Sequence, residues 1–512
     1  MDARGECAPR RVGDVALVVT HRPERLRYLQ LDRRARARQG RAGPRRGPRR
    51  PAAVWSDGKR ADGVGRSRGH RARPRQRPGV PGHRRRAPGA RRRRAARAPV
   101  DHRPGADAAA VNVFFHTFGC RANQYDTELV RQAFSDRGAV VVDDPTIADL
   151  AVVNSCTVTH ESEAKLRRFV RRLRIETVVM GCAAALDDGA IAALPSVRAV
   201  VGGSDPNAVL RAAGFAAPRA DRVLRRFGAH ARAWLKIQDG CDEHCTFCAT
   251  TLARGANRSR AVPELVREAQ QLGAHHAELV LTGVHIGTYG RDAGCEMRDA
   301  SPLGELLEAL VAAVPDMRFR LSSIEATEVD DRLARLLIEA PRHLVPHLHA
   351  PLQSGSNRVL KRMGRHWYTA ESYRARLEWL AERLPVFGLG ADVIAGFPGE
   401  TNADHGATLD LIRALPFTYL HVFPFSERPG APAARLGGPV PPAAIRERAA
   451  ELRALGEERA ALHRAHRTGA VADGVASGRH GGKLEVLTED YLSVYVPSEP
   501  WDGRPRFPVT IA

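Results

Sequence analysis

Apolar and polar positions along residues 111–216 follow a pattern of alternating strands and helices. Short apolar runs of strand length are followed by amphipathic stretches with helical spacing, and the connections are short. The predicted strands are residues 111–115, 150–153, 177–180 and 197–201, and a basic helix is predicted over residues 161–174. Because strands that alternate with helices pair in parallel, we expect a Rossmann-like α/β domain over residues 111–216.

A second set of apolar runs follows over residues 232–438. Six predicted strands each run into a polar or glycine-rich turn, with amphipathic helices such as 263–272 and 370–384 between them. The strands are residues 233–237, 278–281, 318–321, 344–348, 389–394 and 419–422. This alternation predicts a partial (βα)6 barrel, in which the chemistry gathers at the C-terminal ends of the strands.

The pattern changes again near residue 439. Residues 439–468 contain a long helix of mixed charge that connects to short alternating runs at 471–476, 483–487, 491–496 and 506–510. Glycine-rich breaks separate these runs, so we expect a small antiparallel β-barrel over residues 469–512. Such barrels often bind RNA on an exposed face, although ordinary packing of an all-β domain explains the pattern equally well.

The excess positive charge of the chain lies in residues 1–110. They carry 31 Arg and one Lys against nine Asp and Glu, an excess of 23 that equals the net charge of the 512-residue chain. The remaining residues are therefore neutral overall. With few large apolar residues, the segment is predicted to be disordered. It is either a basic arm that adds phosphate contacts or upstream sequence included through a misplaced start, and we favour the second interpretation.

Neither a signal peptide nor a membrane span is predicted. The apolar run 15–20 follows an acidic residue and precedes more arginine, and no run approaches the roughly 20 apolar residues of a membrane helix. We therefore expect a cytoplasmic protein with no membrane partner. Its eight cysteines are then expected to be metal ligands or free thiols. Cys7 and Cys295 fall outside the two groups described next, and no role is assigned to them.

Three cysteines follow the first predicted barrel strand within eight positions. Cys241, Cys245 and Cys248 allow one loop to surround a metal centre with three thiolates. A structural zinc site needs a fourth ligand, whereas an iron–sulfur cluster held by three thiolates keeps one iron open. The C-x3-C-x2-C spacing, with Phe247 before the last cysteine, resembles radical S-adenosylmethionine (SAM) enzymes. A cluster is therefore favoured over a zinc knuckle.

Three further cysteines each follow a predicted strand of the first domain. Cys120, Cys156 and Cys182 are far apart in sequence. Because the carboxyl ends of parallel strands meet at one edge of the sheet, we expect the three to lie together. A second cluster is the hypothesis, and small buried hydrophobic side chains are the alternative.

Other turns at the barrel strand ends supply candidate contacts to SAM. Gly283 allows close approach of the backbone, and Ser322, Ser323 and Glu325 offer polar groups. Each could equally be a helix cap or a satisfied polar group of the core. Candidates for phosphate contacts, or for solvated surface charge, follow the cysteine loop at Arg254, Arg258 and Arg260.

Together these motifs resemble the methylthiotransferase family over residues 111–496. The matching stretches are HTFGCRANQYDTE (116–128), NSCTVT (154–159), LARG (252–255), LTGVH (281–285), SSIEA (322–326), PLQSGSN (351–357) and LHVFP (420–424). They are most similar to the branch that modifies N6-threonylcarbamoyladenosine in tRNA. Thr251 departs from the family pattern, which usually has proline after the cluster loop.

The resemblance implies an N-terminal α/β domain, a radical SAM partial barrel and a TRAM-like RNA-binding barrel. It also implies two 4Fe–4S clusters. Cys241, Cys245 and Cys248 would be catalytic and hold the cluster that binds SAM, and Cys120, Cys156 and Cys182 would hold an auxiliary one. SAM itself would contact Phe247, Gly283, Ser322, Ser323, Glu325 and Gln353.

The expected activity is transfer of a methylthio group to carbon 2 of N6-threonylcarbamoyladenosine beside the anticodon. The expected partners are tRNA and an electron donor such as flavodoxin or ferredoxin, the sulfur source is unidentified, and the protein is expected to be a monomer. A methylthiotransferase of the isopentenyladenosine or ribosomal-protein branch, or a non-catalytic iron–sulfur protein that binds RNA, is the alternative.

Overall fold

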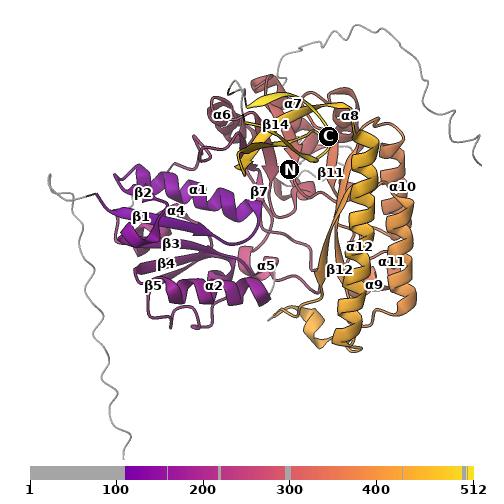
Figure 1. Cartoon of the computed structure of the whole chain (residues 1–512). Coiled ribbons are helices and arrows are strands. Elements are labelled where there is room, and N and C mark those ends of the chain that lie inside the picture. The colour runs from indigo at the N-terminus through magenta and orange to yellow at the C-terminus, as the bar shows by residue number, and fades with distance from the viewer. Residues whose placement is uncertain are drawn as a thin grey trace, which may run out of the picture. The chain divides into compact units, whose positions relative to one another are not determined.

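The computed structural model describes residues 110–157, 160–216, 221–293, 301–428, 430–498, 503 and 505–512 (Figure 1). The predicted disorder of residues 1–110 concerns a segment of which only residue 110 is described, and Cys7 and Cys295 also lie outside the described residues. None of the described helices is long and apolar enough to cross a membrane.

The first described domain is a parallel sheet with helices on both faces. Its strand order is β2-β1-β3-β4-β5. The strands are β1 (Asn112–Thr117), β2 (Val140–Val142), β3 (Leu150–Ser155), β4 (Glu176–Gly181) and β5 (Val197–Gly202). The helices are α1 (Arg121–Ser135), α2 (His160–Arg172), α3 (Cys182–Ala185) and α4 (Pro206–Ala212). The four predicted strands are confirmed, and the three-residue edge strand β2 is an addition that the sequence pattern did not reveal.

Alternate residues of these strands belong to two separate cores. On one face, Val113 and Val152 pack with α1 and α4. On the other, Phe114 and Val153 pack with α2 and α3. Side chains of a strand alternate between the two faces of its sheet, so a strand that is apolar throughout, such as β3, is buried on both sides.

The central part consists of parallel strands in chain order. One sheet holds β6 (Arg232–Lys236), β9 (Glu278–Thr282) and β10 (Arg318–Leu321), and the next holds β11 (His347–His349), β12 (Gly388–Ala395) and β13 (Tyr419–Pro424). Two isolated parallel bridges, Phe319–Leu344 and Ser323–His349, link β10 to the segment around β11. All six predicted strands of this part are confirmed. The separation into two sheets was not predicted.

Helices alternate with these strands and bury their apolar sides against them. They are α6 (Val262–Gly273), α7 (Pro302–Ala313), α8 (Asp331–Glu339), α9 (Asn357–Arg362), α10 (Ala370–Ala381) and α11 (Asn402–Ala414). Three shorter elements, β7 (Gln238–Asp239), α5 (Thr250–Arg254) and β8 (Arg258–Ser259), follow β6. Single 3-10 turns are η1 (Pro145–Ile147), η2 (Ile286–Thr288), η3 (Arg291–Ala293), η4 (Ala326–Glu328) and η5 (Pro432–Arg435).

A long helix leads to the C-terminal sheet. This helix, α12 (Pro442–Arg467), precedes β14 (Val471–His480), β15 (Lys483–Leu487), β16 (Ser493–Pro497) and β17 (Arg506–Thr510). The strands pair antiparallel in the order β16-β15-β14-β17. Among the described residues, β16 and β17 are the edges of this sheet, so closure into a barrel stays a prediction.

A buried ion cluster joins the C-terminal sheet to the central strands. The carboxylate of Glu278 in β9, fully buried, accepts hydrogen bonds from Arg318 (2.6 Å), Arg232 (2.7 Å) and Arg320 (3.1 Å). Arg318 and Arg320 also donate to backbone carbonyls of residues 473 and 487–489. Burial alone would raise the pKa of Glu278, but the arginines outweigh it and hold this pKa well below its usual range. One carboxylate thus holds the guanidinium groups that anchor the C-terminal sheet.

We predict that Glu278→Gln destabilises the protein by about 3–5 kcal/mol, because it leaves buried guanidinium groups without their counter-charge. The midpoint of urea unfolding measures the effect. Glu305→Gln is the control, since Glu305 makes an exposed pair with Arg332 (2.8 Å) whose loss costs less than about 1 kcal/mol. Equal midpoints for the two variants would contradict the anchoring role of Glu278.

Candidate active site between two cysteine triplets

The loop that carries the first triplet lies between β7 and α5. Strands β7 and β8 pair antiparallel at its base, and the Cys241 N–H donates to the Gly255 carbonyl (3.0 Å). Gly240 has a φ of 74°, and a Cβ at this position would lie 1.9 Å from the Ala256 carbonyl oxygen. Only glycine fits such a turn. Backbone bonding therefore holds the two ends of the loop together.

Polar side chains surround the thiols of this loop. Arg365 donates to Cys245 Sγ (3.5 Å), and His285 Nδ1 lies 3.7 Å from Cys241 Sγ. Burial raises the pKa of Cys245 to about 12, although Arg365 opposes the shift. Because metals bind the thiolate, loading this site must release protons.

Two threonines stabilise the C-terminal side of the loop. The Thr250 N–H donates to Cys248 Sγ (3.3 Å). The hydroxyl of Thr251 donates to the carbonyls of Cys241 and Glu243 (both 3.2 Å). These two hydrogen bonds cross the loop, so they supply a local restraint that a proline could not make.

The second triplet meets at the carboxyl ends of the strands in the first sheet. Cys120 caps α1, Cys156 follows β3, and Cys182 begins α3 directly after β4. The Cys120 and Cys182 thiols lie 3.5 and 3.9 Å from Asn123 Oδ1. A Cβ on Gly119, whose φ is 110°, would lie 2.8 Å from Cys156 Cβ. The structure thus brings together three cysteines that are distant in sequence.

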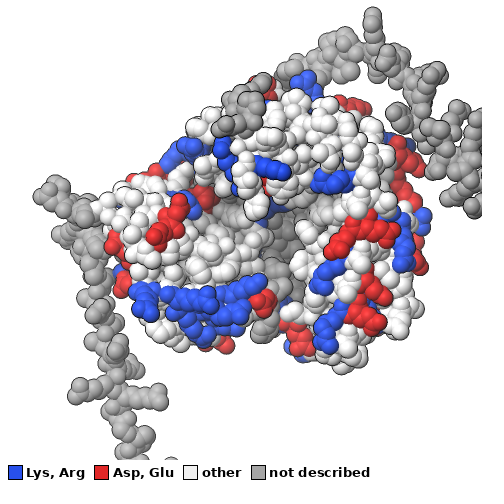
Figure 2. Space-filling model, viewed as in Figure 1, with Lys and Arg blue, Asp and Glu red and all other residues white. Residues whose placement is uncertain are grey.

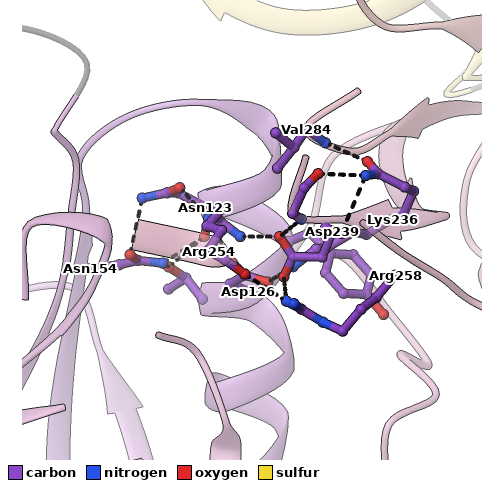
Figure 3. Close-up of polar contacts among 12 residues, drawn as sticks. Asn123, Asp126, Asn154, Lys236, Asp239, Arg254, Arg258 and Val284 are labelled. Carbon is purple, nitrogen blue, oxygen red and sulfur yellow. Dashed lines mark hydrogen bonds and ion pairs between the residues drawn. The ribbon is translucent and has the colours of Figure 1, made fainter. Parts of the chain in front are cut away.

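Figure 3 shows a network of ion pairs and hydrogen bonds around Asp126, Asp239 and Arg254, next to the loop that carries the first triplet. Arg254 of α5 donates to Asp239 (2.9 Å) and Asp126 (3.0 Å), and Lys236 donates to the same two carboxylates at 2.8 and 2.6 Å. Burial would raise the pKa of Asp239, but the two cations hold it well below its usual range. Because Asp126 belongs to α1, the network joins the first domain to the segment that follows β6.

Arg254 also reaches the second triplet directly. Its Nε donates to Cys182 Sγ (3.2 Å), and its Nη2 donates to Asn123 Oδ1 (2.7 Å). The Asn123 amide in turn donates to Asn154 Oδ1 (3.1 Å) and to a β3 carbonyl. A single side chain therefore spans from the helix after the first cysteine loop to a thiol of the second triplet.

The phosphate contacts predicted for two of the three arginines after the loop are wrong. Arg254 is buried in the network just described. Arg260 pairs with Glu264 and Glu268 (both 2.7 Å) and donates to the Tyr125 hydroxyl. Neither guanidinium is solvated surface charge. Only Arg258, whose side chain is 57% exposed, remains available for an external ligand.

A buried carboxylate faces the first triplet from the end of β10. Glu325 pairs with Arg365, and its second oxygen, Oε2, is buried without a hydrogen-bond partner among the described residues. Burial raises the pKa of Glu325, whereas Arg365 lowers it. On the other side, Phe247 packs edge-on against Phe397. Glu325 therefore offers an unused acceptor beside the thiols.

The remaining predicted SAM contacts have different environments. Gly283 allows close approach of Gln238, whose Oε1 would lie 2.7 Å from a Cβ at that position. Ser322 is buried and Ser323 is exposed. Gln353 is buried and has a φ of 61°, which a residue other than glycine rarely adopts. Such strain is commonly found at functional sites, so Gln353 keeps its place as a candidate.

A cavity of about 740 Å³ extends to the second triplet. Its walls come from the ends of β4 and β5, from α5 and from the segment around β8. They include Cys182, Asp205, Arg254 and Glu264. Cys182 is therefore accessible from outside.

A group that the sequence did not reveal lies on β11, β12 and β13. The Asp392 Oδ1 lies 3.0 Å from His349 Nε2 and 3.2 Å from His421 Nδ1, and Tyr419 OH lies 3.1 Å from His349 Nδ1. These residues are adjacent only because the strands pair in register, with Asp392 opposite His421. No local sequence motif predicts this group of residues.

Comparison with known proteins identifies the chain. Residues 235–412 match the radical SAM superfamily, and residues 112–202 match a family described as "Uncharacterized protein family UPF0004". The chain is 40% identical over 369 residues to the threonylcarbamoyladenosine tRNA methylthiotransferase MtaB of Bacillus subtilis, covering 68% of this chain and 80% of the relative. It belongs to the radical SAM methylthiotransferases. The corresponding protein of Thermotoga maritima is 37% identical, with 66% and 80% covered.

Among solved structures, the chain is similar to the radical SAM methyltransferase TsrM from Kitasatospora setae with cobalamin and a [4Fe-4S] cluster bound. The identity is 15%, the TM-score is 0.48, and the match covers 64% of this chain and 77% of that one.

The donor groups fit the cofactors of the family, SAM and 4Fe–4S clusters. All six described cysteines are free of disulfides, and His285 Nδ1 is a further potential ligand beside Cys241 of the first triplet. Among the described residues, only His349, Asp392 and His421 form a group whose ligand atoms all lie within 4.8 Å. One zinc ion would need its sulfur atoms about 3.8 Å apart, whereas a cluster binds each thiolate through a separate iron. Thiolates are the ligands of iron–sulfur clusters, so the thiols of this chain fit the cofactors of the family.

We predict that Arg254→Gln costs about 3–5 kcal/mol of stability in the apoprotein, because Asp126 and Asp239 would be left buried with Lys236 as their remaining buried cation. Thermal and urea unfolding midpoints measure the change. Arg258→Gln, at the exposed edge of the same network, should cost less than about 1 kcal/mol. If the two variants have the same unfolding midpoints, Arg254 does not hold α1 against the segment that follows β6.

Proposed function

We propose that this protein transfers a methylthio group to carbon 2 of N6-threonylcarbamoyladenosine beside the anticodon of tRNA, using SAM and two 4Fe–4S clusters. Two relatives are named threonylcarbamoyladenosine tRNA methylthiotransferase, and the match covers 80% of the length of each. One structural observation supports the reaction more than any other. There are two separate sets of three thiols, and Arg254 donates to a thiol of one set from the helix that directly follows the loop of the other.

Cys241, Cys245 and Cys248 would hold the cluster that binds SAM. Such a cluster, when bound, supplies the electron that cleaves SAM and so provides a radical able to take hydrogen from the base. The chain holds these thiolates in a loop closed by backbone bonds. The free Glu325 Oε2 would accept a hydrogen bond from SAM, and Phe247 would cover the apolar side.

The other predicted contacts would complete the SAM pocket. Ser322 and Ser323 would supply hydroxyl groups at the end of β10. The positive φ of Gln353 would direct its side chain, and Gly283 would let the backbone approach the cofactor.

Cys120, Cys156 and Cys182 would hold the auxiliary cluster, which carries the sulfur to be inserted. The cavity beside Cys182 would give a sulfur source access to this site. The N–H···S hydrogen bond from Arg254 would stabilise negative charge on the Cys182 sulfur, as outer-shell donors do at metal sites. Asn123 would keep the ligand-bearing turns in register.

The domains would divide these tasks. A Rossmann-like domain (111–216) would carry the auxiliary cluster, and a radical SAM core (232–438) would carry SAM. A connecting helix (439–468) would lead to a TRAM-like domain (469–512) that binds RNA. Tyr495 on β16 is 51% exposed, so it is available to stack on a base.

Further partners follow from the chemistry. Reductive cleavage of SAM needs a low-potential electron donor such as flavodoxin or ferredoxin. The substrate places the enzyme in the cytoplasm, and both cysteine triplets come from a single chain, so a monomer suffices.

Deletion of the gene should remove 2-methylthio-N6-threonylcarbamoyladenosine from total tRNA, and the full chain should restore it. Nucleoside mass spectrometry is the measurement. A Cys241→Ala/Cys245→Ala/Cys248→Ala variant should fail to restore it, because no SAM cleavage is possible without the thiolates. An unchanged nucleoside after deletion would exclude this substrate and direct the search to ribosomal-protein peptides.

After anaerobic reconstitution, a Cys120→Ala/Cys156→Ala/Cys182→Ala variant should bind about half of the wild-type iron, because one of two similar clusters is lost. A Cys7→Ala/Cys295→Ala variant is the control and should keep all of it. If the Cys120→Ala/Cys156→Ala/Cys182→Ala variant binds as much iron as the wild type, these three cysteines hold no cluster, and the auxiliary site is contradicted.

A further inference from the structure

Helix α2 carries a band of exposed basic side chains, which we call the α2 ridge. Figure 2 shows it as a continuous stretch of Lys and Arg, whereas acidic and basic side chains are mixed over α12. Its members are exposed and come from the last two turns of the helix and the residues just after it: Lys165, Arg168, Arg171, Arg172 and Arg174.

Most of this charge is not neutralised by the protein. Glu161 pairs with Lys165 (3.8 Å) and Arg168 (3.1 Å). Arg171, Arg172 and Arg174 have no acidic partner within 4 Å in the part of the chain that the structure describes. The helix dipole favours basic residues in the last turn, but by at most about 1 kcal/mol each. It does not account for a band that begins two turns earlier.

The spacing of the ridge suits a phosphate backbone. Lys165, Arg168 and Arg172 lie on one side of the helix, at steps of three and four residues. At a rise of about 1.5 Å per residue, the steps are roughly 4.5–6 Å. From Lys165 to Arg172 the helix rises about 10.5 Å, a length over which one nucleic-acid strand, with a charge about every 3.4 Å along its axis, carries about three phosphates.

The N-terminal end of α2, opposite to the ridge, lies close to the second cysteine triplet. Cys156 and Thr157 lie a few residues before α2, and the Thr157 hydroxyl donates to Glu163 in its first turn (2.8 Å). Arg428, from the chain after β13, donates to the Thr157 carbonyl (3.0 Å) and pairs with Glu163. These contacts fix the beginning of α2 at the triplet, so its basic end lies two to three helical turns away.

We propose that the α2 ridge binds the sugar–phosphate backbone of the tRNA stem next to the modified nucleotide. A strand lying along α2 would lead one nucleotide to Cys156 and its neighbours, where the base is to be modified. Contacts of this kind position the RNA without reading its sequence. The inference rests on the proposed tRNA substrate and adds the surface that holds it.

The experiment compares Arg171→Glu/Arg172→Glu on α2 with Arg446→Glu/Arg453→Glu on α12, both in the full chain. The two variants make the same change in net charge at exposed positions. All proteins keep residues 1–110, so the contribution of that basic segment is common to them. Binding of unmodified and modified tRNA is measured by fluorescence anisotropy over a range of salt concentrations. Formation of 5′-deoxyadenosine from SAM without tRNA, and the thermal unfolding midpoint, report on the fold and the SAM site.

We expect the α2 variant to bind tRNA at least tenfold more weakly than the α12 variant. Its slope of log affinity against log salt should be shallower by roughly 1.4–1.8, which corresponds to two lost phosphate contacts. SAM cleavage and unfolding should match those of the wild type. Equal affinities and slopes for the two variants would overturn the assignment of this surface. That outcome would concern the α2 ridge alone. If the wild-type protein shows no salt-dependent binding of tRNA, both the proposed substrate and the α2 ridge are contradicted.

Discussion

The ion network around Arg254 is the interaction on which the arrangement of the site depends. Two carboxylates, Asp126 and Asp239, and two cations, Lys236 and Arg254, form ion pairs where α1 meets the segment after β6, and all of them except the partly exposed Asp239 are nearly buried. Buried charges are costly unless each has its partner in good geometry. The segments can therefore meet in few other ways, and the two cysteine triplets take their relative positions from that contact.

The same physical device anchors the C-terminal sheet. Glu278 accepts hydrogen bonds from three arginines of the neighbouring strands β6 and β10. Two of them, Arg318 and Arg320, also donate to backbone carbonyls of the C-terminal residues. These charged residues and the His349–Asp392–His421 group lie on the strand face opposite to apolar residues such as Leu279 and Val393, which pack in the main core. One face of the strands thus provides stability, and the other is left for docking and chemistry.

Most of the fold could be predicted from local patterns. Runs such as 150–153 and 279–281 are apolar because both faces of a parallel strand are buried, so their strands were recognisable. The edge strand β2 has three residues and half-exposed valines, too little for a pattern. The roles of Arg254 and Arg260 were mistaken for a related reason: an arginine paired in the interior and one free on the surface look identical in sequence, and only the partners distinguish them.

By itself, the sequence determined most of the strands and several of the helices, and the spacing of Cys241, Cys245 and Cys248 within one loop predicted which thiols can share a centre. It also placed the second triplet at strand ends. Only the tertiary structure decided that Arg254 links the triplets, that Glu325 keeps an unused oxygen, and that α2 presents its basic side chains outward. Each of these depends on which distant groups meet, and burial of charge depends on its partners rather than on its neighbours along the chain.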